Sequence, residues 1–222
     1  MNGQCKICGS KTREFYYKTF DLNYYQCNEC DFISRDGNSI ISSEEEVGIY
    51  NEHENSIEDP RYVAYFKKFI DEAVVNYSGQ GKKGLDFGSG PSPVLATVLE
   101  RDYNYSMDIY DVYYAPEKTY IGQKYDLVTC TEVVEHLSNP LEYFHLFKEL
   151  LKEDGILCIM TSFHPKDEER FLKWHYVRDL THVSFFTLKT MKIIGEKLGI
   201  DIIYSDHHRY TTFKRSNSGL TG

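Results

Sequence analysis

From residue 82 onward the sequence alternates short apolar runs with stretches of helical periodicity, and this alternation constrains the fold more than any other feature. The run KKGLDF is followed by the helical stretch VLATVLERD, and YDLVTC is followed, after a short segment, by LEYFHLFKELLKE. Such alternation is typical of parallel strands whose connecting helices cover both faces of one sheet. In sheets of this kind, ligands bind at the carboxyl ends of the strands. We therefore predict a mostly parallel α/β domain over residues 81–222.

The rest of this region continues the pattern and then changes it. NYSMDIYD and GILCIMTSF have the composition of buried strands, and TLKTMKIIGEKLG has that of a helix. This helix should end near Gly199, because glycine favours the left-handed conformation just past a helix. The last two runs, IDIIYS and RYTTFKR, flank an Asp-His-His turn and are expected to form an antiparallel pair.

Four of the six cysteines occur in the first 30 residues, as two Cys-x-x-Cys pairs separated by eighteen residues. Each pair presents two thiolates to one ion, and two pairs on neighbouring hairpins complete a tetrahedron. Because protein fills all four positions, we predict a structural zinc ribbon over residues 1–40; the alternatives are a reactive dithiol or reduced core cysteines. Cys130 and Cys158 lie in apolar runs and are expected to be inert core residues. The predicted zinc ligands are Cys5, Cys8, Cys27 and Cys30.

Residues 41–80 differ in character from the segments on either side. They carry nine acidic and three basic side chains, and the stretch RYVAYFKKFIDEAVVNY places Val63, Phe66, Ile70 and Val74 near helical spacing. We predict an acidic connector followed by an amphipathic helix that packs on the α/β domain.

Charge and hydropathy exclude some classes of partner. The formal net charge of −9 disfavours nucleic acid, because lysine and arginine provide most of the affinity for a phosphate backbone. No apolar run approaches the roughly 20 residues needed to cross a bilayer. The opening MNGQCKICGS also lacks the apolar core of a secretory signal. The sequence therefore predicts a cytoplasmic protein with no membrane partner, and it specifies no oligomeric state.

The stretch GLDFGSGPSP links a predicted strand to a predicted helix. Gly88 and Gly90 let the backbone approach a ligand closely, and the helix end offers unpaired N–H groups. Many such turns use glycine only for its positive φ. Here, however, Asp86 lies at the strand end, and Asp111 ends the next strand about 20 residues later, where a carboxylate can accept both hydroxyls of a ribose. A dinucleotide enzyme would carry a third glycine three positions after the second, but Pro-Ser-Pro follows Gly90.

Three stretches together resemble the landmarks of class I S-adenosylmethionine-dependent methyltransferases: LDFGSG, the acidic strand end IYD, and YDLVTCTEVVEHL. The resemblance covers residues 82–162. It implies a Rossmann-like, mostly parallel seven-stranded sheet with helices on both faces, in which only TYIGQ stands for the third strand.

The same resemblance implies S-adenosylmethionine as the cofactor and assigns residues to it. Asp111 would hold the ribose. Tyr50 would cap the carboxylate end, as an aromatic residue upstream of the glycine turn often does in the family, and the alternative for this tyrosine is packing within the connector. The residues expected to line the methionine portion are Asp86, Gly88, Ser89 and Gly90.

The stretch TCTEVVEHL places Glu132, Glu135 and His136 just after a buried strand. On a helix, positions that differ by three and four share one face. The simplest interpretation is a solvated first turn whose glutamates favour the positive end of the helix. The position beside the expected methyl group supports a second interpretation, in which two carboxylates and a neutral imidazole bind Mg²⁺ or Mn²⁺.

A later segment, KWHYVRDLTHVSFFT, follows the strand GILCIMTSF and should fold over the same crevice. The early Glu-Val-x-Glu-His and the later Asp-x-x-His-x-x-Phe resemble two metal-dependent groups of the family, the small-RNA 3′-terminal 2′-O-methyltransferases and the O-methyltransferases of ubiquinone synthesis. This resemblance implies that Glu132, Glu135, His136 and His182 bind a divalent ion that holds a substrate hydroxyl.

Two alternatives apply to this second segment. His182 is either structural and satisfied by Asp179, or it acts with His136 as a general base whose imidazole Asp179 orients. Trp174 and Tyr176 either stack on a planar or sugar substrate or cover the core, because both roles suit aromatic rings with a polar tip.

The sequence thus predicts a methyltransferase that transfers a methyl group to an oxygen of a small hydroxylated substrate (a sugar, polyol or phenol) activated by a divalent ion. An RNA 2′-O-methyltransferase is the first alternative, but residues 163–182 balance four basic against four acidic side chains. The others are a metal-independent transfer to carbon or nitrogen with a histidine base, and a zinc-ribbon adaptor on an inactive methyltransferase scaffold.

Overall fold

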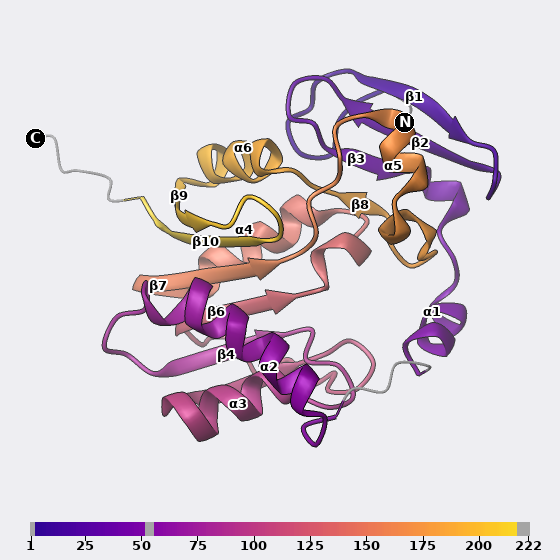
Figure 1. Cartoon of the computed structure of the whole chain (residues 1–222). Helices are drawn as coiled ribbons and strands as arrows, with labels where there is room; N and C mark the ends of the chain where they lie inside the picture. Colours follow the sequence, from indigo (N-terminus) through magenta and orange to yellow (C-terminus); the bar gives the residue numbers. More distant parts are fainter. Residues whose placement is uncertain (1–2, 52–55, 217–222) are drawn as a thin grey trace, which may run out of the picture.

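A mixed six-stranded sheet forms the centre of the molecule (Figure 1). The computed structural model describes residues 3–51 and 56–216 of the chain. The strand order is β5-β4-β6-β7-β10-β9, parallel from β5 to β7 and antiparallel at β10 and β9, so the predicted mostly parallel fold and its antiparallel last pair are confirmed. The strands are β4 (Lys83–Phe87), β5 (Ser106–Tyr110), β6 (Tyr125–Thr131), β7 (Leu151–Met160), β9 (Ile200–Ser205) and β10 (Tyr210–Arg215).

The sheet has six strands rather than the seven that the sequence predicts. The segment TYIGQ forms turns, and β5 is left at the edge of the sheet. Residues 112–124 contain several strand-favouring side chains, so composition alone does not exclude a strand there. The reason is tertiary: Asp111 accepts hydrogen bonds from the amides of Tyr113 and Tyr114, and Tyr120 packs against Phe87 and Tyr110.

Helices cover both faces of the sheet, as predicted. One face carries α2 (Pro60–Phe69), its π-helical continuation Ile70–Val75 and α3 (Val94–Tyr103). The other face carries α4 (Pro140–Leu150) and α6 (Leu188–Leu198). The predicted end of the last helix is confirmed, since Gly199 adopts the left-handed conformation with φ 64°. Helix α4 ends at residue 150, three residues before the predicted limit, because Leu151 already pairs with Tyr125 in the sheet.

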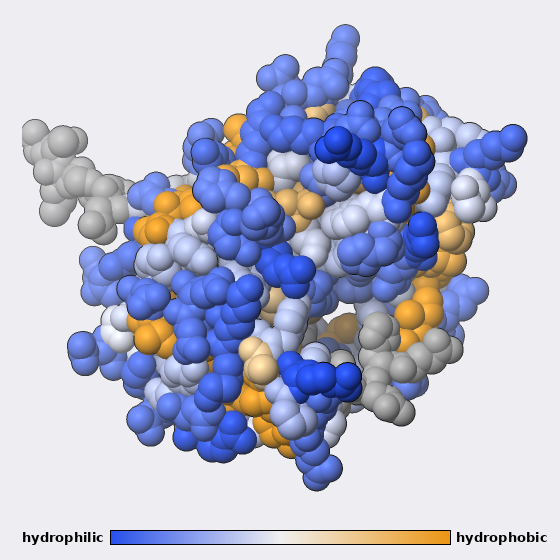
Figure 2. Space-filling model, in the orientation of Figure 1, coloured by the Kyte–Doolittle hydropathy of each residue, from blue (hydrophilic) through white to orange (hydrophobic). Residues whose placement is uncertain are grey.

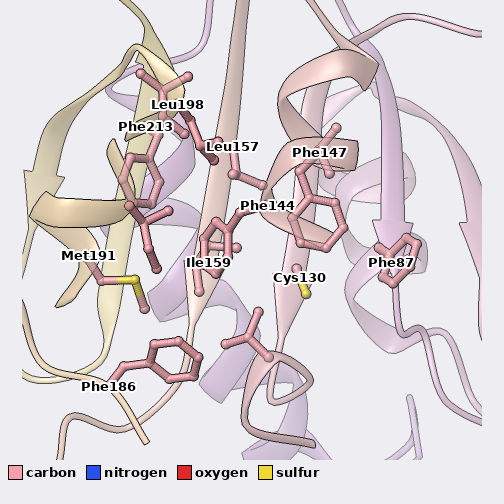
Figure 3. Close-up of a cluster of buried hydrophobic side chains, with 14 of the residues drawn as sticks. Phe87, Cys130, Phe144, Phe147, Leu157, Ile159, Phe186, Met191, Leu198 and Phe213 are labelled. Atoms are coloured by element: carbon pink, nitrogen blue, oxygen red, sulfur yellow. The ribbon is translucent and has the colours of Figure 1, made fainter. Parts of the chain in front are cut away.

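Strand β7 shows how the sequence builds two cores. Because side chains alternate across a strand, Ile156 and Cys158 face α2 and α3, whereas Leu157 and Ile159 face α4 and α6. Figure 3 shows the second group between the helices, with Phe144 and Phe147 of α4, Met191 and Leu198 of α6, and Phe213 of β10. The expected burial of Cys130 and Cys158 is confirmed.

The N-terminal segment forms a small antiparallel sheet of β1 (Thr12–Tyr17), β2 (Leu22–Cys27) and β3 (Ile33–Arg35). Its fourth strand, β8 (Ser184–Phe185), comes from the segment after β7, far along the chain, and pairs with β3 (Figure 1). The pairing therefore crosses the boundary expected at residue 40, and the ribbon packs on the same core as α4 and α6.

Short helices connect these parts. Helix α1 (Ser43–Tyr50) begins with a capping box between Ser42 and Glu45 and lies in the acidic connector. Helix α5 (Glu168–Lys173) and the 3₁₀ turn His175–Arg178 lie in the segment that leads from β7 to β8. Two further 3₁₀ turns are Gly37–Ser39 and Val134–His136. Within the described residues, none of the helices is both long and apolar enough to cross a membrane.

Candidate active site

A cavity of about 850 Å³ lies at the carboxyl ends of β4, β5 and β6. The glycine turn, the ends of β5 and β6, the connector and the segment after β7 all contribute to its lining. On this side of the molecule the surface is hollowed (Figure 2). The cavity is therefore at the edge of the sheet where the fold class places ligands.

The glycine turn needs glycine at two positions for different reasons. Gly88 has φ +86°, and a Cβ atom there would lie 2.1 Å from Cγ2 of Val133. Gly90 has φ +66° and open space where its Cβ atom would be. The Gly88 amide donates to the carbonyl of Tyr110 at 2.7 Å, which fixes the turn against the end of β5. Gly90 thus leaves a cradle that a side chain would fill, and Ser89 lies between the two glycines on the cavity wall.

Two aspartates flank this turn, and both line the cavity. Asp86 is buried, accepts a hydrogen bond from Oγ1 of Thr129 at 2.8 Å, and has a pKa raised to about 7, chiefly by burial. Asp111 accepts hydrogen bonds from the amides of Gly90, Tyr113 and Tyr114 at 2.9, 2.9 and 3.1 Å. Its carboxylate therefore ties the glycine turn to the loop after β5.

Tyr50 lines the same cavity from the end of α1. Its hydroxyl donates to Glu46 at 2.6 Å, and its ring meets the ring of His136 edge-on at 5.4 Å. Burial and the bond to Glu46 raise the pKa of the phenol. The structure places this tyrosine against the histidine cluster.

The stretch that carries Glu132, Glu135 and His136 does not form the helix turn that would put all three on one face. Glu132 adopts φ +53° and donates its amide to the carbonyl of Met160 at 2.8 Å, and a 3₁₀ turn follows over Val134–His136. This local geometry results from tertiary contacts, because Val133 packs closely on the glycine turn. Side chains from other segments of the chain, rather than a shared helix face, connect these polar residues.

Two tyrosines connect the two glutamates. The hydroxyl of Tyr65, from α2, donates to Oε1 of Glu132 at 2.8 Å. The hydroxyl of Tyr176 lies 3.0 Å from Oε2 of Glu132 and also contacts Oε1 of Glu135. Sequence reasoning missed Tyr65, since nothing in a helical stretch rich in tyrosine marks one of them as polar. For Tyr176, the hydrogen bonds place its polar tip in the site.

Glu135 is the most unusual group in this network, since its side chain is 0% exposed. Its Oε2 atom has no hydrogen-bond partner among the described residues. Burial, followed by the charge of Glu132, raises the pKa of Glu135 well above its ordinary value. A buried carboxylate with a free oxygen needs either a proton or a cation to offset its desolvation.

Two histidines adjoin Glu135 and are held as neutral imidazoles. His182 directs Nδ1 at the carbonyl of Tyr176 at 2.8 Å, and His136 directs Nδ1 at the carbonyl of Thr181 at 3.3 Å. Carbonyls only accept, so both rings carry the proton on Nδ1 and leave Nε2 as a lone pair. Burial lowers the pKa of both histidines, that of His136 to about 3. These are the protonation states that a metal ligand requires.

The structure therefore brings together three of the four residues predicted to bind a divalent ion. Glu135, His136 and His182 each offer a ligand atom, and these atoms lie within 4.8 Å of one another. Glu132 stands outside this group and is engaged by the two tyrosines. The mixture of one carboxylate and two imidazoles fits a divalent ion that also keeps open positions. Asp179 lies 3.7 Å from Nε2 of His182 and accepts two hydrogen bonds from Thr181.

The ribbon cysteines form a second cluster, away from the cavity. Their four sulfur atoms lie within 4.8 Å of one another, with 3.4 Å between Cys5 and Cys30 and between Cys8 and Cys27. The hydrogen bond with Cys30 is the main cause that lowers the pKa of Cys5 to about 5. Four converging sulfurs match the donor set of structural zinc. Trp174 lies on the ribbon side, in contact with Phe171 and Phe185 rather than in the cavity.

A glycine turn after the first parallel strand, a carboxylate at the end of the second and a polar cluster after β6 share one cavity. This combination defines a class I S-adenosylmethionine-dependent methyltransferase. Residues 60–205 match the family model described as a methyltransferase domain, and the chain belongs to this family.

Curated relatives give the same class. The ubiquinone biosynthesis O-methyltransferase of Dinoroseobacter shibae is 34% identical over 104 residues, which are 41% of this chain and 39% of that protein. The protein of the same name from Actinobacillus pleuropneumoniae serotype 7 is 28% identical over 95 residues, 41% of this chain and 40% of that one. That of Glaesserella parasuis is 51% identical over 39 residues, 18% of this chain and 16% of the relative. The chain thus spans less than half the length of these relatives.

Solved structures support the fold. An O-methyltransferase family protein from Burkholderia thailandensis has a TM-score of 0.51 at 13% identity, covering 72% of this chain and 61% of that one. The crystal structure of LaPhzM gives 0.51 at 14% identity, covering 78% and 59%. At these identities the likeness extends to the fold alone.

Proposed function

We propose that this protein transfers the methyl group of S-adenosylmethionine to a hydroxyl oxygen of a small uncharged acceptor, which a divalent ion holds at Glu135, His136 and His182. The observation that carries the proposal is the buried Oε2 of Glu135, which lacks a hydrogen-bond partner within the described part of the chain and lies beside two neutral imidazoles. His136 and His182 line the cavity that the glycine turn also lines. A buried anionic oxygen with two nitrogen donors is a site that a cation completes.

The charge of the cavity supports a neutral acceptor. Arg61 is the only lysine or arginine among the lining residues of the described chain, and its side chain is largely exposed. Phosphate recognition relies on such cations, so this lining disfavours RNA and phosphorylated acceptors. Aromatic faces suit a phenol or a sugar ring instead. The lining carboxylates are Glu46, Asp59, Asp86, Asp111, Glu132 and Asp179.

In this proposal the residues of the chain divide into two groups. Asp86, Gly88, Ser89, Gly90 and Asp111 bind the cofactor, and the cradle at Gly90 gives its backbone close access to the ligand.

The second group holds the acceptor. A bound divalent ion would lower the pKa of a coordinated hydroxyl and fix its oxygen. Tyr176 and Tyr65 keep Glu132 fixed beside that hydroxyl, where an ionised carboxylate can take its proton. We also propose that the four ribbon cysteines bind zinc, and that Tyr50 contributes to the cofactor end of the cavity.

The names of the curated relatives favour oxygen as the acceptor atom, since these proteins are called ubiquinone biosynthesis O-methyltransferases. A second candidate mechanism uses no ion. The 3.7 Å separation of Asp179 and Nε2 of His182 favours it, because a carboxylate at that position would stabilise an imidazolium after proton transfer.

The test uses the full chain with its zinc content measured. Protein treated with EDTA until only the ribbon zinc remains is assayed for S-adenosylhomocysteine release with catechol, an uncharged hexose and a short RNA as acceptors, before and after Mn²⁺ or Mg²⁺ is restored. Activity that disappears and returns with the ion, on catechol or hexose, is the expected result. Full activity without the ion would favour the histidine base. Methylation of RNA with a steep salt dependence would overturn the neutral acceptor.

A further inference from the structure

The ribbon strand β3 lies directly behind the segment that carries His182. Its residues Ile33 and Ser34 pair with Phe185 and Ser184 of β8. The amide of Arg35 extends this ladder, because it donates to the carbonyl of Val183 at 2.9 Å. The backbone that follows His182 is therefore an added strand of the ribbon sheet (Figure 1).

The same few residues are bound on their other side to the turn that carries Glu135. The amide of Val183 donates to the carbonyl of Glu135 at 2.8 Å, and Oγ of Ser184 donates to the carbonyl of Leu137 at 2.6 Å. A continuous run of hydrogen bonds thus leads from β3 through Val183 to Glu135. Two of the three residues of the candidate ion site depend on it for their backbone position.

The cysteine knuckle that precedes β3 is fixed in turn by the α/β domain. Oγ1 of Thr190 donates to the carbonyl of Cys30 at 2.8 Å, and Nε2 of His164 lies 2.7 Å from the carbonyl of Asp31. These contacts accompany the burial of His164. They attach the cysteine knuckle, and the strand β3 that follows it, to the α/β domain.

Arg35 adds a charge to this path. Its side chain is 1% exposed, and its Nε and Nη2 atoms have no hydrogen-bond partner among the described residues. A buried guanidinium without partners is costly unless an opposite charge is near. Burial lowers the pKa of Arg35, and the nearby Tyr24 and then Asp179 oppose that effect, but no salt bridge joins Arg35 to a carboxylate among the described residues.

From this geometry we infer that the zinc ribbon is the outer wall of the acceptor site, and that zinc in the ribbon, acting through β3 and Arg35, fixes the positions of His182 and Glu135. Arg35 is a positioning residue, since its buried side chain anchors the end of β3 and its amide holds the carbonyl of Val183. The inference rests on the proposed function only for the role assigned to the histidine and glutamate cluster. Within the described residues, β4, which precedes the glycine turn, pairs with β5 and β6 and with none of the ribbon strands, so the cofactor half stays outside this coupling.

The first test is hydrogen exchange on the full chain, with the ribbon zinc present and after its removal by a thiol-specific chelator. Loss of zinc is expected to speed exchange at least tenfold in peptides that cover residues 180–187 and 132–138, while peptides over residues 83–90 and 94–103 keep their protection. S-adenosylhomocysteine affinity, measured by calorimetry, should change less than about threefold. Unchanged protection at residues 180–187 would overturn the inference, and so would an equal loss of protection over the whole chain.

The second test uses Arg35→Met, Arg35→Lys and, as a matched control, Lys18→Met on the exposed part of the ribbon. All three are compared with the native protein, with zinc retained and Mn²⁺ binding followed by electron paramagnetic resonance. Arg35→Met should weaken Mn²⁺ binding about tenfold, Arg35→Lys should restore part of it, and Lys18→Met should change nothing. Native protein that fails to bind Mn²⁺ would refute the proposed function and leave the exchange test standing. Native binding that Arg35→Met leaves intact would refute the role of Arg35.

Discussion

Replacing Glu135 with glutamine separates the metal interpretation of the cluster from its alternatives. The substitution keeps the size of the side chain and removes its charge and its capacity to bind a cation through Oε2. The native side chain is fully buried, and that oxygen has no hydrogen-bond partner among the described residues. The consequences for stability therefore have opposite signs with and without a bound ion.

With the ion present, native protein gains stability by mass action. At an ion concentration of 100 times Kd the gain is about 2.7 kcal/mol. For a chain of this size each kcal/mol corresponds to roughly 2–4 °C in Tm, so Mn²⁺ should raise the Tm of the native protein by about 5–10 °C. Glu135→Gln should lose most of this shift, because one of three protein ligands is gone.

Without the ion, the substitution should be neutral or stabilising, and the reason is the pKa of Glu135. Burial and the neighbouring charge of Glu132 raise this pKa above its value in the unfolded chain. The folded state then holds a proton that the unfolded state releases above about pH 4.3. The stability of the native protein should therefore fall as the pH rises from the unfolded pKa toward the folded one. Glutamine cannot ionise, so the variant should lose the part of this fall that Glu135 contributes, while Asp86, whose pKa burial also raises, keeps its own part.

The assay is differential scanning calorimetry of zinc-loaded protein at several pH values between 5 and 8, with EDTA-treated samples before and after addition of Mn²⁺. Glu142→Gln is the matched control, since Glu142 is an exposed residue of α4. The control should keep the native Mn²⁺ shift and the native pH dependence. An equal Mn²⁺ shift in Glu135→Gln and native protein would refute the assignment of Glu135 as a ligand.

Three further substitutions test the rest of the site. Gly88→Ala should cost about 2 kcal/mol or more of stability and lower S-adenosylhomocysteine affinity at least tenfold, because the new Cβ atom would have a positive φ and overlap Val133. Thermal melts measure the stability and calorimetry the affinity, and an affinity equal to that of the native protein would contradict the packing. Tyr176→Phe removes a hydroxyl shared by two carboxylates, which is worth about 1.5–3 kcal/mol, and should weaken Mn²⁺ binding about tenfold or more without changing cofactor affinity. Asp111→Asn should weaken S-adenosylhomocysteine binding by at least tenfold, because the carboxylate orders the glycine turn through the amide of Gly90. The rise in Tm caused by Mn²⁺ should stay the same, and a change in it would contradict the separation of the cavity into a cofactor half and an acceptor half.

Local patterns in the sequence were sufficient to predict those features that depend only on residues close together in the chain. The order of strands and helices after residue 82, the left-handed Gly199 and the antiparallel last pair follow from periodicity and turn chemistry, and the structure has them as predicted. The seventh strand was wrong because a family pattern was extended over a segment that hydrogen bonds to Asp111 and the packing of Tyr120 hold outside the sheet. The cysteine spacing predicted a convergent cluster, since a Cys-x-x-Cys pair places its sulfurs together by itself.

The candidate site could be predicted only as a set of residues near one strand end. A helical face was expected to unite Glu132, Glu135 and His136, and the backbone there is a left-handed residue followed by a 3₁₀ turn. The separation of Glu132 from the three potential ligands depends on Tyr65, which lies 67 positions earlier in the chain. No local pattern carries information about a hydrogen bond between such distant segments.

By itself, then, the sequence determined the class of fold, the glycine turn with its two aspartates, and the cysteine cluster, because each of these is specified by residues close together in the chain. Only the tertiary structure decided that β8 joins the ribbon sheet, that Arg35 is buried, and that Oε2 of Glu135 has no hydrogen-bond partner among the described residues. These features arise from burial and from contacts between distant segments. Desolvation, which sets the charge of a carboxylate or an imidazole, exists only once the chain has folded around them.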